Sequence, residues 1–135
     1  MDIDLIGKLQ EAFPDLDENA LRELSGLVRL KTYAPNTLIC KEGAFEQVFY
    51  LIVEGEVAIT KHLHSDEERV LRHSVAGDFF GEMALIQDVP RAANVRTIKE
   101  TTVLEFDREV FENLMGSSPQ LAWRMVRTTF DRLRA

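Results

Sequence analysis

Apolar residues recur at helical spacing near both ends of the chain and gather in short runs between them. Near the N-terminus, Phe13 and Pro14 interrupt a first helical segment, and Asp15 or Asp17 is placed to cap a second one. Leucine and valine then return every three or four residues, which predicts a helix that continues to about Leu30. This helix is expected to bury one leucine-rich face.

After Lys31 the chain changes to short β-rich runs separated by turn residues. The runs are KTYA, NTLIC, VFYLIVEG, EVAITKHL, RVLRHSVA, AANVRTI and TTVLEFD. Such a rhythm is typical of an antiparallel sandwich or barrel. Glu54 and Gly55 lie between two of these runs, and glycine readily adopts the positive φ of a tight turn, so the runs on either side are predicted to form a hairpin.

From Asp107 the helical pattern returns, first over residues 108–115 and then, after the break that ends at Pro119, through Leu133. The order of elements predicts a mainly β fold, an antiparallel, jelly-roll-like β-roll (a double-stranded β-helix). The N-terminal helix, a short helix inside the roll and the C-terminal helices accompany it.

The chain has 135 residues and a mass of 15.4 kDa, which suits one domain with a core of its own. We expect residues 1–135 to form this single domain, with helices over 1–30, the β-roll over 31–106 and helices over 107–135. Hydrophobic residues make up 45% and charged residues 29%, so neither a disordered chain nor a membrane span is indicated.

Charge and cysteine content narrow the range of partners. The formal net charge of -7 repels polyanions, so nucleic acid is not expected as a partner. The single cysteine, Cys40, cannot form an internal disulfide, and the opening sequence MDIDLIGKLQ lacks the basic and apolar regions of a signal peptide. We expect a cytoplasmic protein, or a cytoplasmic piece of a larger one, without membrane contact by this segment.

The segment over residues 77–95 breaks the strand rhythm with a short helical piece at residues 82–85. The N-terminus of such a helix directs unpaired N–H groups outward, which favours an anion. Arg91 offers paired planar donors to phosphate oxygens. A carboxylate such as Glu82 would repel a phosphate but accepts hydrogen bonds from neutral hydroxyls. The pattern therefore favours a ligand that carries both a phosphate and a sugar.

The run FGEMALIQDVPRAANV resembles the phosphate-binding cassette of cyclic nucleotide-binding domains. These domains occur in the catabolite activator protein, in the regulatory subunit of cAMP-dependent protein kinase and in cyclic nucleotide-gated channels. The upstream run ICKEGAFEQVFYLIVEGEVAIT is similar to the family's first β-roll strands, and the predicted helices fall where the family has its helices. The resemblance covers nearly the whole chain.

The resemblance implies a role for each cassette position. It places Glu82 on the ribose and Arg91 on the cyclic phosphate, with the backbone amides of Ala84 and Ala92 also on the phosphate. The implied nucleotide contacts are Gly81, Glu82, Met83, Ala84, Arg91, Ala92 and Ala93 within the cassette at 80–95, and Ile59 and Leu71 on the strands that face it. Members selective for cGMP often have Thr where this chain has Ala92, so the resemblance favours cAMP, with cGMP as the other ligand.

The family also implies a regulatory mechanism in place of catalysis. A residue of the last helix often caps the base, and that helix moves when the ligand arrives. Trp123, Arg127 and Phe130 lie near one helical stripe and are the candidates here, although the pattern of the two aromatic residues favours packing in a core or a dimer over capping of the base. A sensor of this kind needs no cofactor, is not an enzyme, and acts through an output domain or partner protein.

Two other interpretations remain open. Glu82 and Arg91 could form an ordinary ion pair, and the chain would then be a ligand-free interaction domain of the same fold that forms a homodimer through its C-terminal helix. A cupin-like metal enzyme is the alternative of another class, because His62, His64 and Glu68 resemble the first half of its metal motif. The second half is missing, so no metal is expected.

Cys40 has no histidine near it in the sequence that could act as a base. We therefore expect an inert, half-buried thiol.

Overall fold

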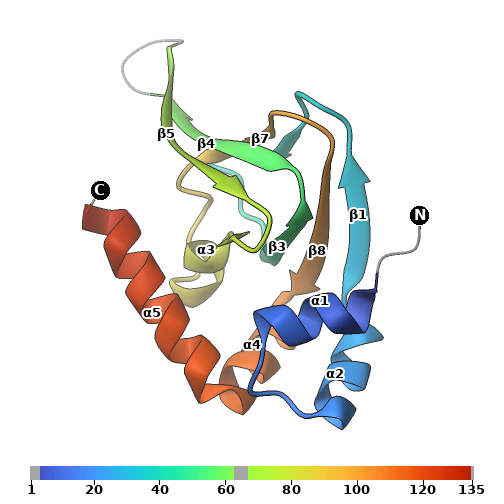
Figure 1. Ribbon diagram of the computed structural model, residues 1–135. Helices are drawn as coiled ribbons and strands as arrows, with labels where there is room; N and C mark the ends of the chain where they lie inside the picture. The colour runs from blue at the N-terminus through green and yellow to red at the C-terminus, as the bar shows by residue number, and fades with distance from the viewer. Residues whose placement is uncertain (1–3, 63–66, 135) are drawn as a thin grey trace. The chain divides into compact units, whose positions relative to one another are not determined.

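The computed structural model describes residues 4–62 and 67–134, and the chain divides into two compact units. The first unit combines Met1–Val28 with Phe106–Ala135, and the second is Arg29–Glu105. Helices make up the first unit, and the strands of the β-roll belong to the second, with one short helix among them (Figure 1).

The helical unit contains α1 (Leu5–Ala12), α2 (Glu18–Ser25), α4 (Arg108–Ser117) and α5 (Pro119–Arg134). Aspartates cap the first three helices, because an aspartate side chain accepts a hydrogen bond from a free N–H of the first turn. Of the two candidates for α2, Asp17 is the cap, because its side chain accepts a hydrogen bond from the Ala20 N–H at 2.8 Å. None of these described helices is long and apolar enough to cross a membrane.

The prediction that the second helix continues to Leu30 is wrong. The helix ends at Ser25, and Arg29–Tyr33 forms strand β1. Leu30 pairs with Leu104 in an antiparallel ladder, which satisfies its backbone groups across the sheet. The long-range pairing overrides the local helical pattern of the leucines.

The two C-terminal helices are confirmed, and Ser118 shows how the chain turns between them. This side chain is fully buried, and its hydroxyl accepts a hydrogen bond from the Leu121 N–H in the first turn of α5 at 3.2 Å. The same hydroxyl donates to Asp15 at 2.5 Å. In the same unit, the rings of Phe13 and Phe106 meet edge to face with centroids 6.0 Å apart.

The described strands of the second unit form two four-stranded sheets. One sheet has the order β1, β8 (Thr101–Asp107), β3 (Val48–Glu54) and β6 (Phe79–Phe80). The other has the order β2 (Leu38–Cys40), β7 (Asn94–Thr97), β4 (Glu56–His62) and β5 (Glu68–Val75). The described pairs are antiparallel, so the predicted antiparallel β-roll is confirmed.

Side chains from both sheets pack into one core, which is why the sheets must face each other. Its buried members are Ile39, Cys40, Tyr50, Ile52, Val57, Ile59, Phe80, Val95 and Val103. The rings of Tyr50 and Phe80 stack at 4.7 Å within this core.

The predicted hairpin across Gly55 is wrong, because the strands on either side of this turn belong to different sheets. The hairpin partner of β4 is β5. Gly55 has a φ of +110°, and a Cβ at this position would lie 2.5 Å from the Thr101 hydroxyl oxygen. The glycine therefore allows the chain to cross from one sheet to the other against the start of β8.

Gly55→Ala is expected to lower the free energy of unfolding by about 3 kcal/mol, because it adds a steric clash to the cost of positive φ. Gly77→Ala is the matched control, since Gly77 has a φ of +93° but a Cβ there would meet no described atom within 4 Å. The control should lose only about 1 kcal/mol in urea unfolding. Equal losses in the two variants would contradict the role given to the close approach of Thr101.

Candidate functional site

The cassette begins where β6 runs into α3 (Glu82–Ile86), the short helix predicted from the sequence. Gly81 joins them with a φ of +90°. A Cβ at this position would lie 2.8 Å from Arg91 Nη1 and 2.8 Å from the Val48 carbonyl oxygen. Only glycine leaves room for these groups to approach the backbone so closely.

Arg91 is the centre of the site, and its side chain is 3% exposed. Nη2 donates a hydrogen bond to the Val48 carbonyl at 2.7 Å, and Nη1 donates to the Gly81 carbonyl at 3.1 Å. The guanidinium carbon lies 5.8 Å from the centroid of the Tyr50 ring. The first residue of β3 and the residue that follows β6 therefore fix the position of this side chain.

The backbone of Arg91 is fixed as well, by the loop between β2 and β3. Its N–H donates to the Ala44 carbonyl at 2.8 Å, and its carbonyl accepts from the Gly43 N–H at 2.9 Å. Backbone and side chain are thus held by different segments, which leaves the guanidinium little freedom to move.

The positive charge of Arg91 is only partly neutralised among the described residues. Nε makes an ion pair with Glu46 at 3.8 Å, but it has no hydrogen-bond partner, and the Glu46 side chain is 44% exposed. A guanidinium has five N–H donors, and two hydrogen bonds are formed here. A buried cation with unused donors favours an anion with several acceptor oxygens.

Glu82 follows directly after the carbonyl that Arg91 binds, and it is 2% exposed. The structure therefore brings the backbone at the start of α3, where Glu82 lies, to the predicted arginine. Of the other cassette positions, Ala84 is buried, Met83 and Ala93 are half-buried, and Ala92 is exposed.

The two positions expected on facing strands lie in different surroundings. Ile59 is 3% exposed and pairs with Val95 on one side and Arg72 on the other. Leu71 is 48% exposed, next to a register shift in the ladder between β4 and β5. Arg72 therefore shares the face of Ile59, because directly paired residues point to the same side of a sheet.

Sequence reasoning missed Arg72. No sequence signal pointed to it, because only the structure shows that Ser74, two positions further along β5, is 2% exposed and faces inward. The irregularity opposite Ile59 and Thr60 is what the sequence alone does not reveal.

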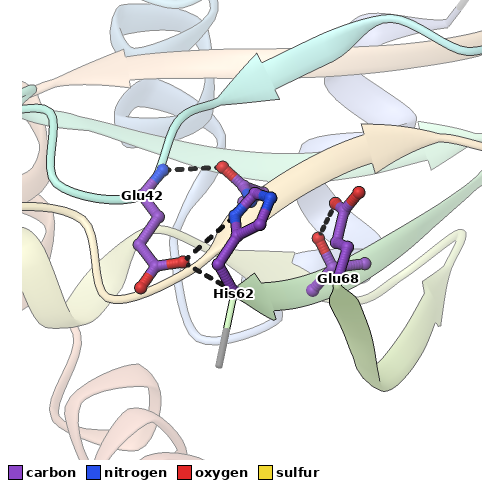
Figure 2. A network of polar contacts seen from close by, with 5 residues as sticks. Glu42, His62 and Glu68 are labelled. Atoms are coloured by element: carbon purple, nitrogen blue, oxygen red, sulfur yellow. Dashed lines mark hydrogen bonds and ion pairs between the residues drawn. The ribbon is translucent and has the colours of Figure 1, made fainter. Parts of the chain in front are cut away.

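A second polar network holds the far end of the cassette (Figure 2). Asn94, which is 4% exposed, accepts a hydrogen bond from the Glu42 N–H at 2.8 Å through its side-chain oxygen. The His62 N–H donates to the Glu42 carboxylate at 3.0 Å, and His62 Nδ1 lies 3.4 Å from the Asn94 side-chain nitrogen. Glu68 is bonded to the Thr60 hydroxyl.

Through these contacts His62 links β4 to Glu42, in the loop after β2, and to Asn94 of β7. His64, the other histidine of the cupin-like motif, lies outside the described residues. Within residues 4–62 and 67–134, no group of three or more His, Cys, Asp and Glu side chains is arranged to hold a metal ion.

Cys40 lies in the core of the roll and is fully buried, not half-buried as expected. Burial raises its pKa to about 12, although the positive charge of Arg91 opposes the shift. The thiol is therefore protonated near neutral pH, which agrees with the expectation of an inert cysteine.

The sequence profile described as "Cyclic nucleotide-binding domain" matches residues 30–118. The cGMP-dependent protein kinase isozyme 1 of Drosophila melanogaster is 36% identical over 110 residues, which cover 79% of this chain and 14% of the kinase. The cAMP-dependent protein kinase regulatory subunit of Hypocrea atroviridis is 37% identical over 94 residues, or 70% of this chain and 19% of the relative.

A solved structure gives the same result. The regulatory domain of Toxoplasma gondii PKA with cAMP superposes with a TM-score of 0.72 at 31% identity, covering 82% of this chain and 42% of that one. The chain belongs to the cyclic nucleotide-binding domain family, whose members serve as ligand-binding modules of regulatory proteins. It spans less than a fifth of the length of the two curated relatives.

Proposed function

We propose that this domain binds cAMP as a regulatory ligand, with Arg91 on the cyclic phosphate and Glu82 on the ribose. The observation that carries the proposal is the buried Arg91 guanidinium, which keeps unused donors among the described residues and binds the carbonyl of Gly81, the residue before the buried Glu82. A cyclic phosphate supplies acceptor oxygens for the arginine, and the ribose hydroxyl supplies a donor for Glu82. The domain makes and breaks no bond, and it needs no cofactor.

The remaining cassette residues surround the ligand in this proposal. The amides of Ala84 and Ala92 complete the phosphate contacts, and Gly81, Met83 and Ala93 shape the cassette around them. Ile59 lines the pocket from the interior of the roll, and the resemblance adds Leu71, which lies half exposed at the register shift in β5.

The identity of the base distinguishes two candidate ligands, cAMP and cGMP. Ala92 supports cAMP by the resemblance on which the proposal rests. Arg72 supports cGMP, because an arginine can donate two hydrogen bonds to the O6 and N7 acceptors of guanine, whereas adenine presents an amino donor in place of O6. The names of the relatives include both nucleotides.

Ligand binding would act through α5. This helix exposes large apolar side chains at Trp123, Val126, Phe130 and Leu133. The spacing of three, four and three residues puts them on one stripe. We propose that the nucleotide favours a state in which the cassette and this stripe close together, and the ligand shifts the equilibrium by the difference in its affinity for the two states.

The same exposed stripe also supports an alternative function, in which the domain binds no ligand and forms a homodimer through α5. A saturable response to nucleotide distinguishes the two functions. We place either function in the cytoplasm, where a free thiol such as Cys40 stays reduced. Either function would act through an output domain or a partner protein.

Arg91→Ala is expected to weaken cAMP binding at least about 100-fold in isothermal titration calorimetry, because a buried charged contact is lost. Arg69→Ala is the matched control, since it removes an exposed arginine from the same unit. It should leave the affinity unchanged. A folded Arg91→Ala protein that binds cAMP as tightly as the wild type would contradict the assignment of the phosphate.

Glu82→Gln is expected to reduce cAMP affinity roughly 10-fold or more, because a hydrogen bond to a charged acceptor is replaced by one to a neutral amide. The wild type should discriminate against 2′-deoxy-cAMP, and the variant should lose most of this discrimination. Equal affinities of the wild type for cAMP and 2′-deoxy-cAMP would contradict the proposal that Glu82 binds the ribose hydroxyl.

Trp123 is the only tryptophan in the chain and is 66% exposed, so its fluorescence reports on α5 alone. Saturating cAMP is expected to change its emission, because closure of the stripe alters its contact with water. The Arg91→Ala protein controls for absorption of light by the nucleotide. Calorimetric binding without any change in emission would contradict the coupling to α5.

A further inference from the structure

The turn that follows α3 contains a residue that local backbone preferences do not favour. The Val89 N–H donates to the Ala84 carbonyl at 3.3 Å, and the Gln87 N–H donates to the Met83 carbonyl at 3.0 Å. Between them, Asp88 has a φ of +56°. A helix that ends in this way places its left-handed residue at Asp88, where glycine is usual because a Cβ is strained there.

The side chain of Asp88 offers a reason for its presence. Its carboxylate accepts a hydrogen bond from Gln47 Nε2 at 2.5 Å, across a sequence separation of 41 residues. Glycine would relax the backbone but would lose this bond. The chain therefore keeps a conformational cost at a position where it gains a long-range contact, and such local inconsistencies tend to mark functional sites.

Gln47 directly precedes Val48, whose carbonyl accepts the 2.7 Å hydrogen bond from Arg91 Nη2. Asp88 lies three positions before Arg91 in the same turn. The Gln47–Asp88 bond thus joins the two segments whose separation sets the position of the guanidinium. Pro90 stiffens the chain between Asp88 and Arg91, because its ring fixes φ.

We propose that Gln47 and Asp88 are positioning residues for the ligand site, and that their hydrogen bond holds Arg91 in the geometry that receives the phosphate. This inference rests on the proposed function, because it concerns the affinity of the same site. Neither residue needs to touch the nucleotide. Both act through the Val48 carbonyl and the turn that carries Arg91.

Two measurements test this inference: the cAMP affinity by calorimetry, and the thermal midpoint of the nucleotide-free protein. Both are made on the wild type, Asp88→Gly, Asp88→Asn, Gln47→Ala and the double variant Gln47→Ala/Asp88→Gly. Asp88→Gly should weaken binding about fivefold, the loss typical of one hydrogen bond, without lowering the thermal midpoint. A merely structural residue would lower both together. Asp88→Asn should restore affinity, because asparagine tolerates positive φ and keeps a side-chain acceptor.

Gln47→Ala should weaken binding by the same factor as Asp88→Gly, and the double variant should lose no more than either single variant, because both remove one bond. The inference would be overturned if Asp88→Gly left the affinity unchanged, or if its thermal midpoint fell in step with the affinity. It would also be overturned if Asp88→Asn did not restore the affinity, or if the double variant lost the sum of the two single losses. Wild-type protein that binds no cyclic nucleotide would instead overturn the proposed function.

Discussion

The burial of the Arg91 guanidinium is the constraint on which the site depends. A charge in a water-poor interior is costly unless dipoles or counter-charges surround it. The surroundings are water-poor, since Tyr50 is 6% exposed and Cys40 is 1% exposed. Two carbonyls, one aromatic ring and the partly exposed Glu46 stabilise the charge, yet they leave donors unused. The site is stable enough to hold the arginine and still favours a further anion.

This constraint explains why distant segments must come together. The cassette leaves one sheet after β6 and joins the other at β7, so it connects the two halves of the roll. Gly81 leaves room for Arg91 at the start of the cassette, and the loop between β2 and β3 holds the Arg91 backbone near its end. The contact between Asn94 and His62 joins the end of the cassette to β4. A ligand that binds Arg91 and Glu82 therefore contacts a segment whose position both sheets determine.

The sequence was sufficient for features that depend on local pattern. The strand runs, the aspartate cap of α2 and the cassette helix at Glu82 follow from alternation, side-chain hydrogen bonding and helix propensity. It failed where long-range pairing decides. Leu30 belongs to a strand because Leu104 lies opposite, and Gly55 turns the chain between sheets because β8 occupies the space beside it. Arg72 was missed because a register shift opposite β4 changes which side chains face Ile59.

The most direct test of a cyclic-phosphate site is the thermal midpoint of nucleotide-free protein with excess cAMP, cGMP or 5′-AMP. A ligand that binds only the folded state stabilises it by about 2.7 kcal/mol at a concentration 100 times its Kd. A cyclic-phosphate site that prefers cAMP predicts a rise with cAMP that exceeds the rise with cGMP, and no rise with 5′-AMP, which lacks the cyclic ester. No rise with either cyclic nucleotide, on protein shown to be free of co-purified ligand, would contradict it.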